Sequence, residues 1–209
     1  MKTHLLILAF ACVTAANATD KLPAISEAWQ QSLTAESNSD YAAALESVLA
    51  YKSAGGATYL AAVRAGWLSY LNKDYPKAIQ FYTTAAKQEP RAITPHLGMM
   101  NVYLAQTQPE DALRAAREVL KIDQFHRPTL LIAGEILFNH QDYRKAEVYF
   151  ERAYKLMPED PIGMSWFGWA QINQGQARFA APLFEKLMET NPQGYMVQDG
   201  FAITRSGPL

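Results

Sequence analysis

The chain has very little cysteine and no excess of charge of either sign. Cys12 is the single cysteine in 209 residues, which excludes an internal disulfide, a thiolate zinc site and a dithiol redox centre. Nineteen Lys and Arg face 20 Asp and Glu, for a formal net charge of -1. This balance argues against a protein that follows nucleic-acid phosphates or docks on membranes through a basic surface. Since 49% of the residues are hydrophobic, we expect a packed core rather than a disordered chain.

Signatures of catalysis are also missing from the sequence. It contains no HExxH, CxxC, GxSxG or phosphate-binding glycine loop. Beyond Ala18 the histidines are His96, His126 and His140, which are widely separated along the chain. The methionines show no metal-binding spacing and suit core packing. We therefore expect no enzymatic activity, no catalytic residue, no metal and no cofactor.

Residues 1–18 have the form of a secretory signal peptide. Lys2 precedes an apolar stretch from Leu5 to Val13, and the small residues Ala16-Asn17-Ala18 follow as a cleavage site. The apolar stretch is too short to cross a membrane, and no later apolar run is long enough either. The sequence predicts a periplasmic protein without a transmembrane segment. Secretion and a lipid anchor on Cys12 are the less favoured alternatives. The anchor is disfavoured because bulky Phe10 stands where a lipid-attachment signal prefers a small residue.

A repeat with a period of thirty-four positions organises most of the remaining chain. Four segments align without a gap and share Ala78, Ala112, Ala146 and Ala180, which are evenly spaced at that period. Three of the four segments also share a glycine, an aromatic residue and a proline at fixed offsets. These columns contain Gly66, Gly134 and Gly168; Tyr82, Phe150 and Phe184; and Pro90, Pro158 and Pro192.

Each column has a physical reason. Small residues let two antiparallel helices approach closely, an aromatic ring fills the space beside them, and a proline ends the second helix. Short polar turns separate the two helices, and Asp74 and Asp142 are placed to cap the second helix. Each unit is therefore predicted to be a helical hairpin.

The small residue, the aromatic residue, the proline and the period together resemble the tetratricopeptide repeat over residues 59 to 192. The resemblance implies an all-α fold, a right-handed α-solenoid of stacked helical hairpins. It places four repeats at 59–92, 93–126, 127–160 and 161–194. Residues 19–58 would form a degenerate N-terminal repeat or capping hairpin, and residues 193–209 a C-terminal capping helix and tail.

Two departures from the repeat pattern are notable. In the repeat from Ile93 to His126, Met100 replaces the glycine and Ala116 the aromatic residue, so large and small side chains exchange places and conserve volume. In the last repeat Pro182 falls inside the second helix. There we expect a kink or a delayed start of the helix.

The resemblance also implies which side chains line the concave wall, namely those at places two, five, nine and twelve of each repeat. The residues at the second place are Leu60, Thr94, Pro128 and Ile162. We call the residues at the other three places the predicted groove residues: Val63, Trp67, Tyr70, Leu97, Asn101, Leu104, Leu131, Glu135, Phe138, Ser165, Trp169 and Ile172.

The composition of this wall indicates the kind of partner. None of these residues is Lys or Arg, and Glu135 has the wrong sign for an acidic peptide terminus. An apolar or amphipathic peptide fits better. The resemblance places Asn101 where it can form a hydrogen bond with the backbone of a ligand. Trp67 and Trp169 are large, rigid side chains that are suited to anchor the ligand.

Other interpretations of the same residues remain open. Val63, Leu97, Leu131 and Ile172 could instead pack in the core. The groove could be filled by the chain's own termini or by a second copy, which would make the protein a self-assembling scaffold. The favoured hypothesis is a non-enzymatic adaptor or assembly factor of the bacterial cell envelope. It has a protein or peptide partner, no nucleic acid and a possible homo-oligomeric state.

Overall fold

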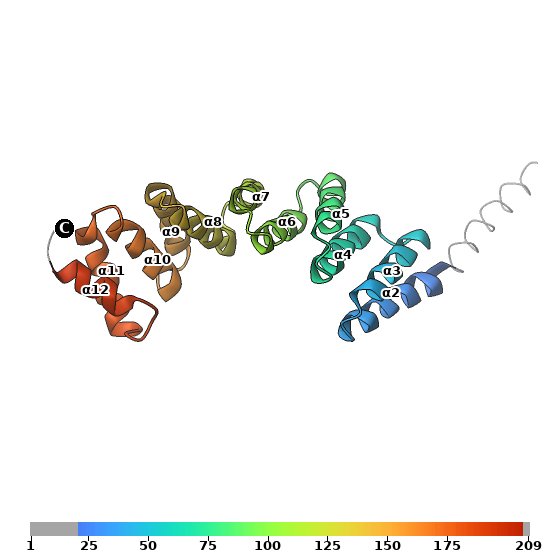
Figure 1. Cartoon of the computed structure of the whole chain (residues 1–209), viewed down its shortest axis with the longest axis horizontal. Helices are drawn as coiled ribbons and strands as arrows, with labels where there is room; N and C mark the ends of the chain where they lie inside the picture. The colour runs from blue at the N-terminus through green and yellow to red at the C-terminus, as the bar shows by residue number, and fades with distance from the viewer. Residues whose placement is uncertain (1–20, 207–209) are drawn as a thin grey trace, which may run out of the picture. The chain divides into compact units, whose positions relative to one another are not determined.

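A computed structural model of the chain describes residues 21–206. The predicted signal peptide, residues 1–18, lies outside this range. Within it every regular element is an α-helix, and Figure 1 labels these helices in chain order. They are α2 (Lys21–Ser37), α3 (Tyr41–Ser53), α4 (Thr58–Leu71), α5 (Tyr75–Gln88), α6 (Thr94–Ala105), α7 (Pro109–Ile122), α8 (Arg127–Asn139), α9 (Tyr143–Leu156), α10 (Pro161–Ile172), α11 (Ala177–Thr190) and α12 (Val197–Arg205).

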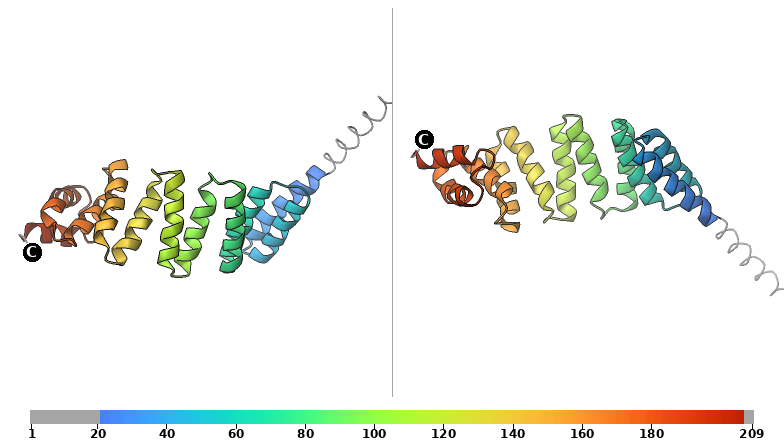
Figure 2. Two further views of the ribbon diagram at one scale, coloured as in Figure 1. Left: turned by 90° about the horizontal axis from the view of Figure 1, so that it is seen from above. Right: turned by 90° about the horizontal axis from the view of Figure 1, so that it is seen from below.

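The helices form two compact units, one ending at Thr107 and the other beginning at Gln108. In the first unit, α2 packs against α3 and α4 against α5, while α6 packs against α4 and α5. In the second unit, α7 and α9 pack against α8, α10 packs against α11, and α12 covers α11 and part of α10. Figure 2 shows α8 and α9 side by side in both views.

Local sequence explains where the helices begin and turn. The side chains of Asp74 and Asp142 accept hydrogen bonds from the backbone N–H of Lys77 and Lys145, so the predicted caps are confirmed. The turn inside each hairpin contains one residue in the left-handed region, which closes the preceding helix. These residues recur at the period of the repeat: Ser39, Lys73, Thr107, Gln141 and Gly175, with φ of 61°, 60°, 56°, 61° and 72°.

The glycine and aromatic columns meet inside the hairpins, as predicted. A Cβ atom on Gly66 would lie 2.8 Å from Cδ1 of Tyr82, and one on Gly134 would lie 2.5 Å from Cε1 of Phe150. A Cβ atom on Gly168 would likewise lie 2.6 Å from Cε2 of Phe184. The rings therefore occupy the space that a side chain on each glycine would need.

Each of these rings also has a second neighbour, on the helix that follows its hairpin. A Cβ atom on Gly98 would lie 2.3 Å from Cζ of Tyr82, and one on Gly200 would lie 2.2 Å from Cε1 of Phe184. The ring of Phe150 instead stacks on Trp166, with 5.3 Å between centroids and 14° between planes. In these three hairpins, one aromatic residue thus joins the hairpin to the next helix.

The two departures from the repeat pattern, Pro182 in one repeat and the pair Met100 and Ala116 in another, have different outcomes. Helix α11 begins at Ala177, the position equivalent to Tyr143 at the start of α9, and continues through Pro182. Of the two expected outcomes the delayed start is therefore wrong, because burial of Ala180, Phe184 and Leu187 stabilises the helix around Pro182. A kink at Pro182 stays a prediction. Met100 and Ala116 are both buried, and exchange of volume between them stays a prediction.

Candidate partner-binding surfaces

The predicted groove residues lie on the first helices of the hairpins, α4 and α6 in one unit and α8 and α10 in the other. Most are half-buried or exposed. Ile172 differs, because only 9% of its surface is exposed and it belongs to a core cluster with Met164 and Phe184. Its side chain is not available at the surface. Leu131 is half-buried and packs against the cores formed around Phe150 and Leu130.

In the first unit, aromatic rings follow one another along α4 and into α5. Trp67 stacks on Tyr70, with 5.6 Å between centroids and 27° between planes. Tyr70 contacts Tyr75 at 6.1 Å. Trp67 is 40% exposed, so this row presents ring surface to solvent beside the core of the hairpin.

Helix α2 fixes the orientation of Trp67 through a polar network. The indole N–H of Trp67 donates to Oε1 of Glu36 at 2.8 Å. Nη2 of Arg64 lies 2.7 Å from Oε2 of the same carboxylate, and Nε of Arg64 donates to the buried hydroxyl of Ser32 at 2.9 Å. The guanidinium also lies over the ring of Trp29, 5.1 Å from its centroid.

This network was missed by sequence reasoning. Glu36 and Ser32 lie upstream of the region in which the repeat pattern is strong, and their spacing to Arg64 carries no motif. The signal that was available is a basic residue on the predicted apolar face, since a half-buried arginine requires an anion or acceptors on a neighbouring helix.

Helix α6 supplies the other surface of the first unit. Asn101 is exposed, Leu104 is 38% exposed and Leu97 is half-buried. Along one stripe of α6, the carboxamide of Asn101 lies about one helical turn from the side chain of Leu97 and about one turn from that of Leu104. This arrangement offers a polar group between two apolar ones. Helix α6 also contacts α4, the other first helix of this unit.

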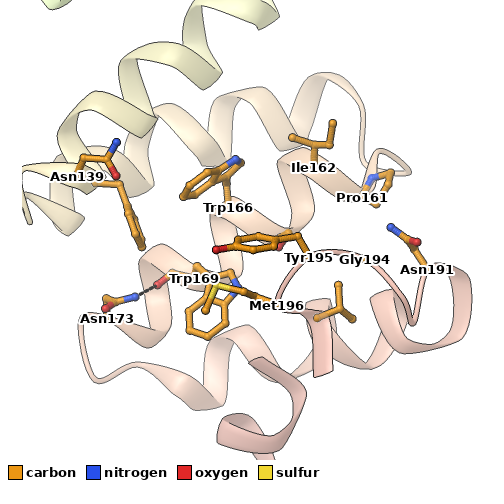
Figure 3. Close-up of a pocket in the computed structure, with 13 residues that line it drawn as sticks. Asn139, Pro161, Ile162, Trp166, Trp169, Asn173, Asn191, Gly194, Tyr195 and Met196 are labelled. Carbon is orange, nitrogen blue, oxygen red and sulfur yellow. Dashed lines mark hydrogen bonds between the residues drawn. The ribbon is translucent and has the colours of Figure 1, made fainter. Parts of the chain in front are cut away.

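The second unit contains a pocket with a volume of about 470 Å³ (Figure 3). It unites three of the predicted groove residues, Phe138, Ser165 and Trp169, and the second-place residue Ile162. Its remaining lining residues are Asn139, Pro161, Trp166, Asn173, Asn191, Gly194, Tyr195, Met196 and Val197. Glu135 is exposed and is not among the lining residues.

One wall of this pocket comes from the connection between α11 and α12, which we call the strap and define as residues 192–196. Figure 3 shows Tyr195 and Met196 projecting from it toward the region of Trp166 and Trp169 on α10. Tyr195 is 85% exposed. Met196, with φ of 55°, precedes α12 and directs the chain into it. Sequence reasoning placed this region at the end of the last repeat and in a capping helix and tail, and considered the tail as a possible occupant of the groove. It did not predict the strap as a pocket wall, because the strap carries no periodic signal beyond Pro192.

The polar groups of the pocket carry no net charge. They include three asparagines, one serine and the indole of Trp169. Nδ2 of Asn173 donates to the backbone carbonyl of Trp169 at 2.9 Å. Within residues 21–206, the indole Nε1 of Trp169 is hidden from solvent and has no hydrogen-bond partner, so a buried donor stands unsatisfied in an otherwise apolar wall.

Among residues 21–206, no group of three or more His, Cys, Asp or Glu side chains is arranged to hold a metal ion. No helix in the same range is both long and apolar enough to cross a membrane.

Comparisons with known proteins agree with the helical repeat. No protein-family model matches the chain. Over 128 residues, or 61% of its length, the chain is 26% identical to anaphase-promoting complex subunit 6 of Arabidopsis thaliana. That match covers only 23% of the plant protein, so the chain spans about a quarter of the curated relative.

Solved structures show the same architecture. A tetratricopeptide repeat protein from Parabacteroides merdae ATCC 43184 superposes with a TM-score of 0.72 and 19% identity, over 87% of this chain and 72% of that one. MamA from Desulfovibrio magneticus RS-1 gives a TM-score of 0.66 and 17% identity, over 82% of this chain and 98% of that one. The chain therefore has the tetratricopeptide-repeat fold, and the predicted all-α class of stacked hairpins is confirmed.

Proposed function

We propose that the chain is a non-enzymatic adaptor or assembly factor that binds an apolar or amphipathic peptide segment along the first helices of its hairpins. The observation that carries this proposal is the exposure of large apolar side chains at groove places, including Trp67 at 40%, Leu104 at 38% and Ile162 at 57%. Their spacing follows the helical stripe that the repeat assigns to ligand contact. Such preformed surfaces bind a segment with little ordering of the receptor.

A matched pair of truncations tests the proposal. Neutral dodecapeptides are selected on the full chain by phage display, and synthetic copies are titrated by fluorescence anisotropy. Leu104→Ala and Leu156→Ala remove the same side chain at equal exposure, 38%, but only Leu104 lies at a groove place. We expect about tenfold weaker binding for Leu104→Ala and no change for Leu156→Ala. Equal effects, or selection of strongly acidic peptides, would contradict groove binding.

The cellular setting is proposed from residues 1–18, which have the form of an export signal. Expressed in a Gram-negative host, the chain is expected in the periplasmic fraction with a mature mass that begins at Thr19. Retention in the cytoplasm would contradict export. Detection of acyl chains on Cys12 would show that the protein is anchored to a membrane through lipid and is not free in the periplasm.

Self-assembly through the same wall is the alternative function. Sedimentation velocity over a range of protein concentrations separates it from peptide binding. Concentration-dependent dimers that disappear in Leu104→Ala would favour the scaffold, whereas a constant monomer that binds the selected peptides supports the adaptor.

A further inference from the structure

We propose that the pocket between α10 and the strap is a binding site for one large apolar residue of an uncharged peptide segment, whose backbone carbonyl accepts a hydrogen bond from Nε1 of Trp169. This inference rests on the proposed function and adds to it a defined subsite and a ligand chemistry. It treats the strap as part of the binding site rather than as a cap alone.

The walls determine the size and polarity of the occupant. The pocket volume of about 470 Å³ lies in the range of sites that enclose small ligands, about 300–1,000 Å³. Ile162, Trp166, Trp169 and Met196 give it an apolar interior. A bulky aliphatic or aromatic side chain fills such a space and removes apolar surface from water.

None of the described residues that line the pocket is charged, which selects against charged ligands. An Asp, Glu, Lys or Arg residue of a partner would lose hydration in the pocket without meeting an opposite charge. The three asparagines, at the ends of α8, α10 and α11, are neutral groups that both donate and accept hydrogen bonds. A peptide backbone, which is neutral and also donates and accepts, is complementary to them.

The unsatisfied indole identifies the missing chemical group. Nε1 of Trp169 is a donor only, is hidden from solvent and has no acceptor in the described structure. By contrast, the indole of Trp67 donates to Glu36. A carbonyl oxygen entering the pocket supplies the acceptor that Trp169 lacks. Because this donor is hidden from solvent, ligand entry requires the non-helical strap to shift.

The exposure of Tyr195 supports a ligand on this side of the fold. The side chain is 85% exposed although it projects from a wall of an apolar pocket (Figure 3). Packing within the chain leaves this ring largely uncovered. A segment that places one side chain in the pocket would extend past the ring and cover part of it.

The probe for a direct test is N-acetyl-L-phenylalaninamide, which has one large apolar side chain and two amide carbonyls. It is titrated into the full chain, and the indole N–H signal of Trp169 is followed by 1H–15N NMR after assignment with Trp169→Phe. We expect saturable binding in the millimolar range with a downfield shift of that signal, because its N–H acquires an acceptor. N-acetyl-L-alaninamide should bind at least tenfold more weakly, and toluene should bind without the downfield shift.

Variants locate the probe. Ser165→Leu fills the pocket and should weaken probe binding at least tenfold, while Tyr195→Ala should weaken it several-fold. Phe179→Ala is the control, since Phe179 is an exposed aromatic residue, at 53%, outside the pocket lining. Circular dichroism checks that each variant is folded, and Tyr195→Ala keeps the test valid if Ser165→Leu does not fold.

The outcomes separate this inference from the proposed function. If the selected dodecapeptides bind in a Leu104-dependent manner but Ser165→Leu and Tyr195→Ala change nothing, groove binding stands and the pocket proposal is overturned. If the phenylalanine probe binds as expected while no dodecapeptide does, the pocket stands and the adaptor proposal fails. A probe that shifts no signal of Trp169 or Trp166, or that binds Ser165→Leu equally well, overturns the inference.

Discussion

The indole N–H of Trp67 is hydrogen-bonded to Oε1 of Glu36 on a different hairpin, at 2.8 Å. The second oxygen of that carboxylate pairs with Arg64 at 2.7 Å, where the side chains of Arg64 and Glu36 are only 12% and 25% exposed. One carboxylate therefore both orients an aromatic ring and neutralises a half-buried cation.

Glu36→Gln tests the importance of that charge. Glutamine retains an acceptor for Trp67 but leaves the guanidinium of Arg64 without its anion, so docking of α2 on α4 should weaken. We expect a loss of about 1–3 kcal/mol, measured by urea denaturation, with faster hydrogen exchange in α2. The control is Glu118→Gln, which breaks the exposed Lys121–Glu118 pair and should cost under about 1 kcal/mol. Equal losses for both variants would show that Arg64 needs no anion.

Gly134→Leu should destabilise the second unit. A side chain at this position would collide with the ring of Phe150, which already has Trp166 stacked at 5.3 Å. The expected loss is about 1–3 kcal/mol from overpacking, measured by chemical denaturation. Met100→Leu exchanges residues of similar volume in the same column and should cost less than about 1.5 kcal/mol. If Gly134→Leu cost no more than Met100→Leu, the close approach of α8 and α9 would be disproved.

Alkaline stability should depend on Tyr82. Burial raises the pKa of its phenol to about 12, with a smaller contribution from neighbouring Tyr70. Since the folded state retains the proton more strongly than the unfolded state, the stabilisation is complete below pH 10 and is lost as the pH rises toward 12. Thermal unfolding of wild type and Tyr82→Phe across the alkaline range measures it. The variant should lose this part of the pH dependence, and parallel profiles would contradict burial of the phenol.

Acid stability should depend in part on Asp74. The hydrogen bond from the side chain of Lys77, aided by that residue's backbone N–H, holds the pKa of Asp74 below its ordinary value of 3.8. A lowered folded-state pKa stabilises the protein above that ordinary value, and the stabilisation disappears as the pH falls through the folded-state pKa.

Asp74→Asn separates charge from capping, because asparagine keeps the oxygen that accepts from the backbone. Helix α5 should still form, as seen by circular dichroism, while urea denaturation at a series of acidic pH values should show a shallower decline than in wild type. The two profiles should converge at the acid end. An unchanged slope would mean that the interaction with Lys77 does not stabilise the folded state.

The parts of the fold that depend on residue type were predictable from sequence. Gly66 and Tyr82 lie in columns that keep their residue types, and these residues meet as expected. The left-handed turn position also recurs once in each repeat, but Ser39, Lys73 and Gly175 share a backbone conformation and no common side chain. Such a column is invisible to a search for similar residues.

The candidate site was predictable only where it lies on the repeats. Phe138, Ser165 and Trp169 were predicted to line a groove and now share a pocket, although a role in binding stays a prediction. Tyr195 and Met196 follow the last repeat, and nothing in their spacing indicates which helix they face. Burial of Ile172 depends on α11 and α12 packing around it, which the register of α10 alone does not determine.

The position of Tyr82 between Gly66 and Gly98 limits how the chain can be rebuilt. The ring belongs to one sequence repeat, yet one of the two surfaces that enclose it is provided by the next repeat. A duplicated or transplanted repeat would therefore arrive with half of its ring's environment missing. Recombination that moves both helices of the repeat together with the following first helix would keep that environment intact, so the module that can be exchanged is longer than the sequence repeat by one helix.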